Sequence, residues 1–259
     1  MYEIIQAYFC LSLVVLAYMT GWFFLALLKK RNDVADIAWG LGFFLIAVLT
    51  FYNTGPAIDR GLIATLLVAI WATRLSVHIY LRNRIKKEDY RYKAWREQWG
   101  KWFYLRTFFQ VFVLQGFFML LIVSPVVIIN IYRGNALNII DLLGIGIWTL
   151  GFYFEAVGDW QLSRFIKNPV NKGKIMQAGL WKYTRHPNYF GEVTQWWGVW
   201  IIALSVPYGW IGIIGPLTIT FLILKVSGIP LLEKNMSNNP LFQEYKKKTS
   251  IFFPLPPKK

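Results

Sequence analysis

The sequence contains few of the residues that build disulfide-linked or metal-stabilised domains. Its 259 residues include one cysteine, Cys10, and two histidines, His78 and His186. A single cysteine cannot form an internal disulfide, and no cluster of cysteine and histidine has the spacing of a zinc site. We therefore expect neither a disulfide framework nor a bound metal.

Charged residues are also scarce. They make up 16% of the chain, whereas 56% is hydrophobic and the mean hydropathy is +0.41. Soluble domains carry about 25% charged and about 45–50% apolar residues, so the composition favours an integral membrane protein. The first apolar run, 4–28, is too long for a signal-peptide core and lacks a basic leader and a cleavage site. We expect it to be a retained membrane helix.

Several apolar runs approach the length of about 20 residues that a helix needs to cross the hydrocarbon of a bilayer. The predicted spans are 4–28, 34–52, 61–81, 107–132, 142–163, 191–206 and 208–228. The predicted fold class is therefore all-α, a polytopic membrane bundle of about seven transmembrane helices. We expect one integral-membrane domain over residues 1–259 that acts as a monomer.

The basic residues are distributed unevenly between the predicted loops. They concentrate in the segments 29–33, 82–106, 163–187 and 225–259. Because cytoplasmic loops are enriched in lysine and arginine, these segments are predicted to be cytoplasmic, with the N-terminus outside and the C-terminus inside. The net charge of +15 follows from this distribution. It would attract anionic membrane lipids, but it is too dispersed for a nucleic-acid-binding domain.

Ionisable and polar side chains occur at the predicted cytoplasmic ends of several spans, although a charge near the bilayer centre costs at least about 2.5–3.5 kcal/mol. The acidic and amide residues are Asp33, Asp36, Glu155, Asp159, Asn188, Glu192 and Gln195. The basic residues are Arg74, His78, Arg82 and Arg164. We expect one polar cavity that opens to the cytoplasm. The alternative is a set of interfacial anchors and inter-helix ion pairs without chemistry.

Residues 184–200, TRHPNYFGEVTQWWGVW, join a basic turn to an aromatic apolar run. Pro187 suits the first turn of a helix, so a helix is predicted to begin there. Free N–H groups and the helix dipole favour an anion at such an end, and Arg185 adds a bidentate donor. Asn188 and Glu192 would then face the cavity. The tryptophans that follow would stack on a flat ring or form an interfacial belt.

The stretch RHPNYFGE (185–192), followed by QWWG, resembles the C-terminal signature of the steroid 5α-reductase superfamily, particularly its bacterial members without an assigned substrate. Further matching stretches are DVADIAWGLGF (33–43), EAVGDWQLSRFIKNP (155–169) and PLFQEYKKKTSIFFPLPP (240–257). The resemblance implies a bundle of seven helices that binds NADPH in a cytoplasm-facing cavity and reduces a C=C bond conjugated to a carbonyl. No G-x-G-x-x-G follows a predicted strand, so a Rossmann domain is not expected.

The resemblance implies that residues from about 142 to 259 form most of the cofactor site. The residues expected to bind the cofactor are Arg74, Arg82, Arg84, Glu155, Asp159, Arg164, Lys167, Asn168, Arg185, His186, Asn188, Tyr189, Glu192, Trp196 and Tyr245. Among them, Arg74, Arg82 and Arg84 would meet phosphates. Asp159 with Lys167 and Asn168 would contact the adenosine half, and Asn188 with Glu192 the nicotinamide and ribose. Tyr245 lies in a segment that would close the cavity.

Hydride transfer to an enone requires a donor aimed at the developing enolate oxygen. His78, Tyr80 or a protonated Asp36 are the expected catalytic donors, since a carboxylic acid in an apolar site can remain neutral. The chain lacks the Gln-Glu pair with which steroid-reducing members polarise their substrate. A steroid is therefore not the expected substrate. The apolar helices that would wall the cavity favour a hydrophobic, lipid-like small molecule that enters from the bilayer, in this setting a bacterial inner membrane.

Two other functions remain open at this stage. Isoprenylcysteine carboxyl methyltransferases also carry RHPxYxG near a membrane C-terminus and bind S-adenosylmethionine. The DIAWG and EAVGDWQ stretches and Glu192 directly after Gly191 favour the reductase instead. A non-catalytic carrier or assembly factor for a lipid is the third possibility, and it predicts a cavity without a nucleotide.

Overall fold

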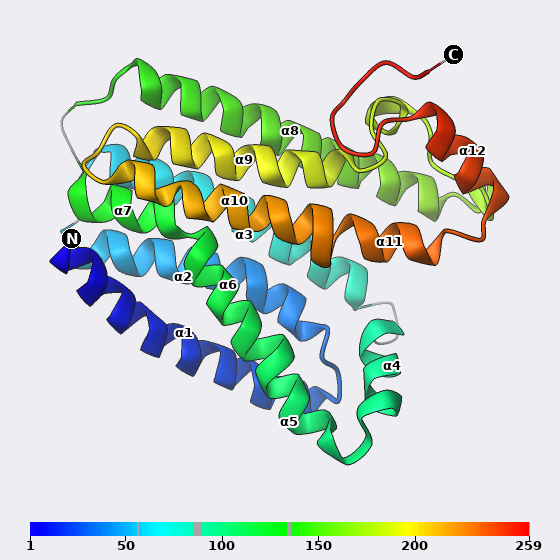
Figure 1. Ribbon diagram of the computed structural model, residues 1–259, viewed down its shortest axis with the longest axis horizontal. Helices are drawn as coiled ribbons and strands as arrows, with labels where there is room; N and C mark the ends of the chain where they lie inside the picture. The colour runs from blue at the N-terminus through cyan, green and yellow to red at the C-terminus, as the bar shows by residue number, and fades with distance from the viewer. Residues whose placement is uncertain (56, 85–89, 134–135, 259) are drawn as a thin grey trace. The chain divides into compact units, whose positions relative to one another are not determined.

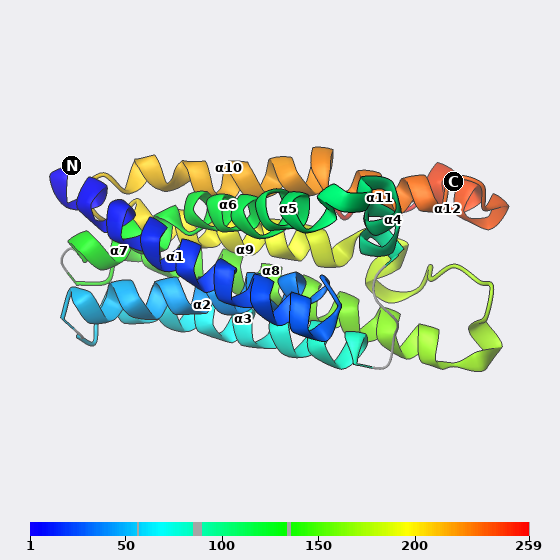
Figure 2. The same cartoon turned by 90° about the horizontal axis from the view of Figure 1, so that it is seen from below.

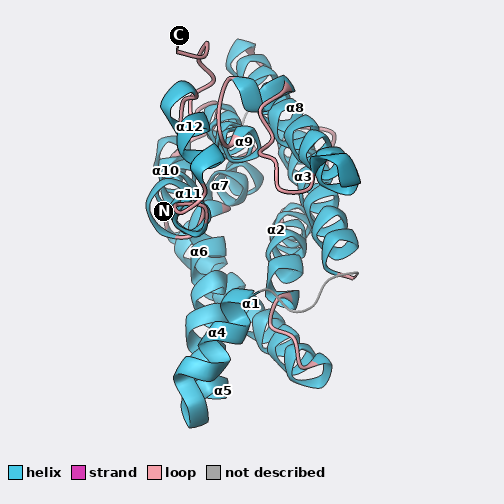
Figure 3. Ribbon diagram, turned by 90° about the vertical axis from the view of Figure 1, so that its right-hand side faces the viewer, coloured by secondary structure: helices cyan, strands magenta, loops and turns pink. Residues whose placement is uncertain are grey.

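The computed structural model describes residues 1–55, 57–84, 90–133 and 136–258. Every regular element in these ranges is helical, as Figure 3 shows, which confirms the all-α class. The chain divides into two compact units. The first comprises Met1–Asn138 and Ala203–Gly215, and the second comprises Ile139–Ile202 and Pro216–Lys259. The single domain predicted over 1–259 stays a prediction.

Six helical stretches in the described residues are long and apolar enough to cross a membrane. They are Tyr2–Lys29, Val34–Asn53, Arg60–Asn83, Ala94–Ile122, Ile139–Lys167 and Gly209–Asn235. By helix length and composition, the chain is therefore an integral membrane protein. The side of the membrane on which each loop lies stays a prediction.

The predicted span 191–206 is not among the six. It corresponds to helix α9, Pro187–Ala203, which has 17 residues. At about 1.5 Å per residue, this helix is about 26 Å long, shorter than the hydrocarbon core of about 30 Å. It begins at Pro187 as predicted. It ends early because a turn follows, in which the Val206 N–H donates to the Ala203 carbonyl at 3.1 Å.

The predicted span 107–132 is also interrupted. The candidate span of this region ends at Ile122, and α7 (Ser124–Tyr132) begins two residues later. Pro125 explains the break, because proline has no N–H and its ring clashes with the carbonyl four residues before it. The apolar run continues through the proline, so hydropathy alone did not reveal the interruption.

Helices α1 (Tyr2–Lys29), α2 (Val34–Asn53) and α3 (Arg60–Asn83) pack in the first unit. Figure 2 shows α2 and α3 side by side. A Cβ added at Gly40 would lie 3.0 Å from the Ala72 carbonyl oxygen, so the two backbones approach closely. The remaining elements of this unit are α4 (Tyr90–Trp99), η1 (Gly100–Trp102), α5 (Phe103–Thr107), η2 (Phe108–Val113), α6 (Leu114–Ile122), α7 and η5 (Gly209–Ile213).

Arg60 and Arg133, which lie outside the basic segments, have structural roles in the first unit. Arg60 is 1% exposed and donates to the carbonyls of Arg133 and Ala136 at 2.6 and 3.2 Å. Arg133 bonds to Asp59 at 3.2 Å. Buried charges are stable only when they are paired and hydrogen-bonded, so these contacts account for both arginines without a ligand.

The second unit contains α8 (Ile139–Lys167) and most of α9, followed along the chain by η6 (Leu222–Val226), α11 (Ile229–Asn235) and α12 (Pro240–Lys248). Helix α10 (Ile214–Phe221) begins in the first unit and continues into the second. Short helices η3 (Pro169–Asn171) and η4 (Gly179–Lys182) lie in the loop between α8 and α9. Figure 1 shows this order by colour along the chain.

Glycines bring α8 and α9 into backbone contact along an antiparallel seam. They recur every seven residues, at Gly144, Gly151 and Gly158 on α8 and at Gly191 and Gly198 on α9. A Cβ added at Gly151 would lie 2.6 Å from the Gly191 carbonyl oxygen, and one at Gly198 would lie 2.6 Å from the Trp148 nitrogen. The seam therefore has no room for side chains at Gly144, Gly151, Gly191 and Gly198, and little room at Gly158.

Candidate functional site

The glycine seam holds a buried polar pair, Glu155 on α8 and Gln195 on α9. Each side chain is 2% exposed. The Gln195 Nε2 group donates to Glu155 Oε2 at 2.5 Å and to the Gly191 carbonyl at 3.3 Å. The Gln195 Oε1 atom is buried and has no hydrogen-bond partner in the part of the chain that the structure describes. A buried acceptor without a partner is costly, so this oxygen indicates a place for a donor.

A second polar contact lies one helical turn further along α8. Asn188 Nδ2 donates to Asp159 Oδ1 at 3.1 Å, and Asn188 Oδ1 accepts from the Tyr189 N–H at 3.0 Å. Glu192 is half-buried one turn along α9 from Asn188, and Trp196, the next residue on this face, is 2% exposed. The structure thus brings Glu155, Asp159, Asn188 and Gln195 together along one helix pair.

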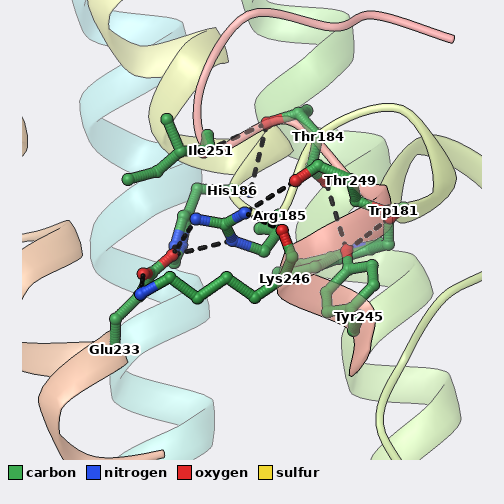
Figure 4. A network of polar contacts seen from close by, with 9 residues as sticks. All are labelled: Trp181, Thr184, Arg185, His186, Glu233, Tyr245, Lys246, Thr249 and Ile251. Carbon is green, nitrogen blue, oxygen red and sulfur yellow. Dashed lines mark hydrogen bonds and ion pairs between the residues drawn. The ribbon is translucent and has the colours of Figure 1, made fainter. Parts of the chain in front are cut away.

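Arg185, just before α9, is the centre of a buried network (Figure 4). Its Nε and Nη2 groups both contact Glu233 Oε1 at 2.8 Å. Its Nη1 group donates to the carbonyls of Lys246 and Thr249 at 3.1 and 2.6 Å. The His186 Nε2 atom lies 3.2 Å from the same Glu233 oxygen. The guanidinium therefore cross-links the start of α9 to α11 and to the C-terminal segment.

Tyr245 on α12 strengthens the same network. Its hydroxyl donates to the carbonyls of Trp181 and Thr184. Burial raises the pKa of this phenol above its ordinary value, an effect that Arg185 opposes and Glu233 reinforces, so the hydroxyl remains a donor. Trp181 Nε1 in turn donates to the Gly158 carbonyl of α8 at 3.0 Å. Arg185 and Tyr245 thus fix the segment that leads into α9, and their contact with a cofactor stays a prediction.

The predicted residues at the end of α8 are exposed. The Arg164 guanidinium lies 5.6 Å from the centroid of the Trp160 ring. Lys167 is the last residue of the helix, and Asn168 Oδ1 accepts from the Val170 N–H at 3.1 Å. These side chains are accessible to a soluble anion, as cofactor phosphates would require.

The remaining predicted residues lie in the first unit. Asp36 on α2 accepts from the Tyr92 hydroxyl at 3.2 Å. On α3, Arg74 and His78 are half-buried and Tyr80 is 55% exposed. Arg82 Nε donates to Asn83 Oδ1 at 3.1 Å, and Arg84 caps the helix. The convergence of these residues with those of the second unit in one cavity stays a prediction.

Sequence reasoning missed two features of this site. The first is Glu233, the shared partner of Arg185 and His186, which stands out in the sequence only as an acid within the basic segment 225–259. The second is the glycine seam, whose seven-residue spacing was a usable signal. No group of His, Cys, Asp and Glu suited to a metal ion occurs within the described ranges.

Comparisons with known proteins agree with part of this interpretation. Residues 22–249 match the family described as "Protein of unknown function (DUF1295)". The chain is 35% identical over 66 residues to 3-oxo-5-alpha-steroid 4-dehydrogenase 1 of Homo sapiens and of Macaca fascicularis, which is 25% of each chain. It is 36% identical over 70 residues to the Bos taurus protein, 27% of this chain and 26% of the relative. The match thus spans about a quarter of these relatives. No solved structure matches.

Proposed function

The chain belongs to the DUF1295 family, and from its partial similarity to 3-oxo-5-alpha-steroid 4-dehydrogenase 1 we propose that it is a membrane-embedded, NADPH-dependent reductase. The reaction would be reduction of an activated C=C bond in a hydrophobic substrate that enters from the bilayer. Six helices able to cross a membrane support this setting. We further propose that the protein acts as a monomer in a bacterial inner membrane.

The observation that carries the proposal is the group of polar side chains in the α8–α9 seam, which comprises Glu155, Asp159, Asn188 and Gln195. Within the described residues, Gln195 Oε1 is an acceptor without a hydrogen-bond partner beside the Glu155 carboxyl, which suits the N–H groups of a carboxamide. Asn188 and Glu192 follow on α9 and could hold ribose hydroxyls. These side chains therefore fit the nicotinamide end of NADPH, which would supply the hydride when bound.

The chain's own residues would supply position and charge. The exposed Arg164 and Lys167 at the end of α8 would meet phosphates. Arg185 and Glu233 would keep the first turn of α9 in place, because their contacts join it to the C-terminal segment. In the first unit, Asp36 with its Tyr92 partner, His78 and Tyr80 remain the proposed donors to the substrate oxygen.

Binding of NADPH to the purified full-length protein, followed by cofactor fluorescence, tests the proposal. We expect wild-type protein to bind NADPH, and Glu192→Gln to weaken binding about 10-fold, the loss of about 1.4 kcal/mol for one hydrogen bond to a charged group. Glu244→Gln, which removes an exposed carboxyl on α12, is the matched control and should bind normally.

Two outcomes would contradict the reductase. Binding of S-adenosylmethionine without NADPH would favour the methyltransferase, and absence of any nucleotide would favour a lipid carrier. With NADPH bound, a panel of apolar enones should show substrate-dependent loss of the absorbance of the reduced cofactor. This assay then defines the substrate class.

A further inference from the structure

A cavity of about 710 Å³, open to the surface, lies in the first unit. It is lined by Leu27, Lys30, Arg96 and Tyr104. Leu27 and Lys30 come from the end of α1, Arg96 from α4 and Tyr104 from α5, which lie near one another in Figure 1. The volume falls within the range of about 300–1,000 Å³ typical of small-ligand sites. Its lining combines two cations, a phenol and one apolar side chain.

We propose that this cavity binds the phosphate of an anionic phospholipid headgroup. An ammonium, a guanidinium and a phenolic O–H are donors suited to phosphate oxygens. The Arg96 guanidinium lies 4.4 Å from the centroid of the buried Phe103 ring. Such cation–π contact orients the guanidinium, so the lining already has one fixed cation. Asp33, the acid on the turn after α1, is bonded to Arg31 at 2.6 Å.

The backbone of Lys30 supports a role for its side chain. Lys30 follows α1 with φ 53° and ψ 33°, the left-handed conformation that ends many helices. Glycine is favoured there, because a Cβ makes this conformation cost about 1–2 kcal/mol. A lysine therefore adds an ammonium to the cavity at a position where glycine would suit the backbone better.

The surroundings favour a lipid over a soluble phosphate. On the last turns of α1, next to the cavity residue Leu27, Phe24 is 58% and Leu28 is 82% exposed. Trp102, with the Lys101 ammonium 5.7 Å from its ring centroid, is 54% exposed. Exposed tryptophan beside lysine is typical of the membrane–water interface. A phospholipid whose headgroup binds in the cavity would thus place its acyl chains along the apolar surface of α1.

Native mass spectrometry of the full-length protein with short-chain lipids tests the proposal. We expect phosphatidylglycerol to bind more tightly than phosphatidylcholine. Lys30→Gly and Arg96→Gln should each weaken phosphatidylglycerol binding about 10-fold, the factor that corresponds to the loss of one hydrogen bond to a charged group. Lys29→Gln is the control, because it removes the same charge from the neighbouring position, which does not line the cavity.

Lys30→Gly separates binding from folding, because glycine relieves the left-handed backbone and should leave the melting temperature unchanged or raised. The site would be rejected if phosphatidylcholine bound equally, or if Lys29→Gln weakened binding as much as Lys30→Gly. If inorganic phosphate at equal concentration displaced the lipid, the cavity would belong to a free phosphate, and the lipid proposal would be wrong. None of these results depends on the reductase activity.

Discussion

At the scale of the residue, the Glu155–Gln195 pair is the most informative contact of the second unit. Both side chains are buried where the helices touch, and one amide oxygen has no partner in the described part of the chain. A chain evolved only for packing would gain from apolar residues at such positions, since replacing both partners of a buried hydrogen bond can be neutral or stabilising. This comparison is the reason for proposing a ligand at the pair.

A double-mutant cycle on Glu155 and Gln195 tests whether the pair contributes to stability. Gln195→Leu removes the Nε2 donor from a buried carboxyl and should destabilise the protein by about 1–3 kcal/mol. The double variant Glu155→Leu/Gln195→Leu should recover part of that loss, because neither polar group then remains. Melting temperatures in detergent would measure both effects.

The control for this cycle is Thr194→Val on the same helix, whose hydroxyl donates to the nearby Phe190 carbonyl at 2.7 Å. We expect a change within about 0.5 kcal/mol for it, as is usual away from buried networks. A double variant less stable than Gln195→Leu would show that the polar pair contributes to folding, and would weaken its assignment as a ligand site.

At the scale of the element, the seam between α8 and α9 depends on its glycines. Gly151→Ala should lower the melting temperature, because the added Cβ would lie 2.6 Å from the Gly191 carbonyl oxygen and force the helices apart. Gly146→Ala on the same helix is the matched control, since a Cβ added there would meet no other part of the described chain within 4 Å beyond its own helix turn. That substitution should stabilise by up to about 1 kcal/mol through helix propensity. Equal effects of the two variants would rule out close helix contact.

The network around Arg185 connects three helices, because it joins the start of α9 to α11 and α12. Glu233→Ala would leave the guanidinium buried without its carboxylate, a loss that typically costs about 3–5 kcal/mol. We expect faster tryptic cleavage after Lys246, Lys247 and Lys248. Glu244→Ala, on the exposed side of α12, should leave cleavage unchanged. Unchanged cleavage in Glu233→Ala would mean that other contacts hold the C-terminal segment.

At the scale of the whole molecule, the distribution of basic residues predicts an orientation. In a Cys10→Ser background, a membrane-impermeant maleimide should label Ala57→Cys from outside the cell. It should label Asn238→Cys only after permeabilisation, because residue 238 lies in the basic segment 225–259. Both positions are exposed. The reverse pattern would invert the orientation and move the site residues to the opposite side.

Much of the helical architecture was predictable from apolar runs. The predicted spans 34–52 and 61–81 agree with α2 and α3 to within two residues, because burial in lipid requires a continuous apolar helix. The interruption near Pro125 was not predicted, since hydropathy reports the solvent around a helix rather than its backbone hydrogen bonds. The end of α9 was predicted three residues too late, at 206 instead of Ala203, for a similar reason, because a turn rather than a polar residue ends the helix.

The site was predictable only where its signals were local. Pro187 marked the start of α9, and the spacing of Asn188 and Glu192 placed them on one helix face. The partner of Arg185 was not predictable, because Glu233 lies 48 residues away in the sequence and only tertiary packing pairs them. Arg185 was therefore predicted as a donor to phosphate, although the structure gives its nitrogen atoms intramolecular acceptors.

The burial of the Arg185–Glu233 pair, with side chains 5% and 11% exposed, has a consequence for how this protein responds to ionic strength. Dissolved ions screen charges that face water and act much less on those enclosed by the chain. Added electrolyte would weaken the attraction of the exposed lysines for anionic membranes and leave the C-terminal cross-link intact. Salt would thus weaken the contacts between exposed lysines and lipid headgroups without loosening the C-terminal cross-link.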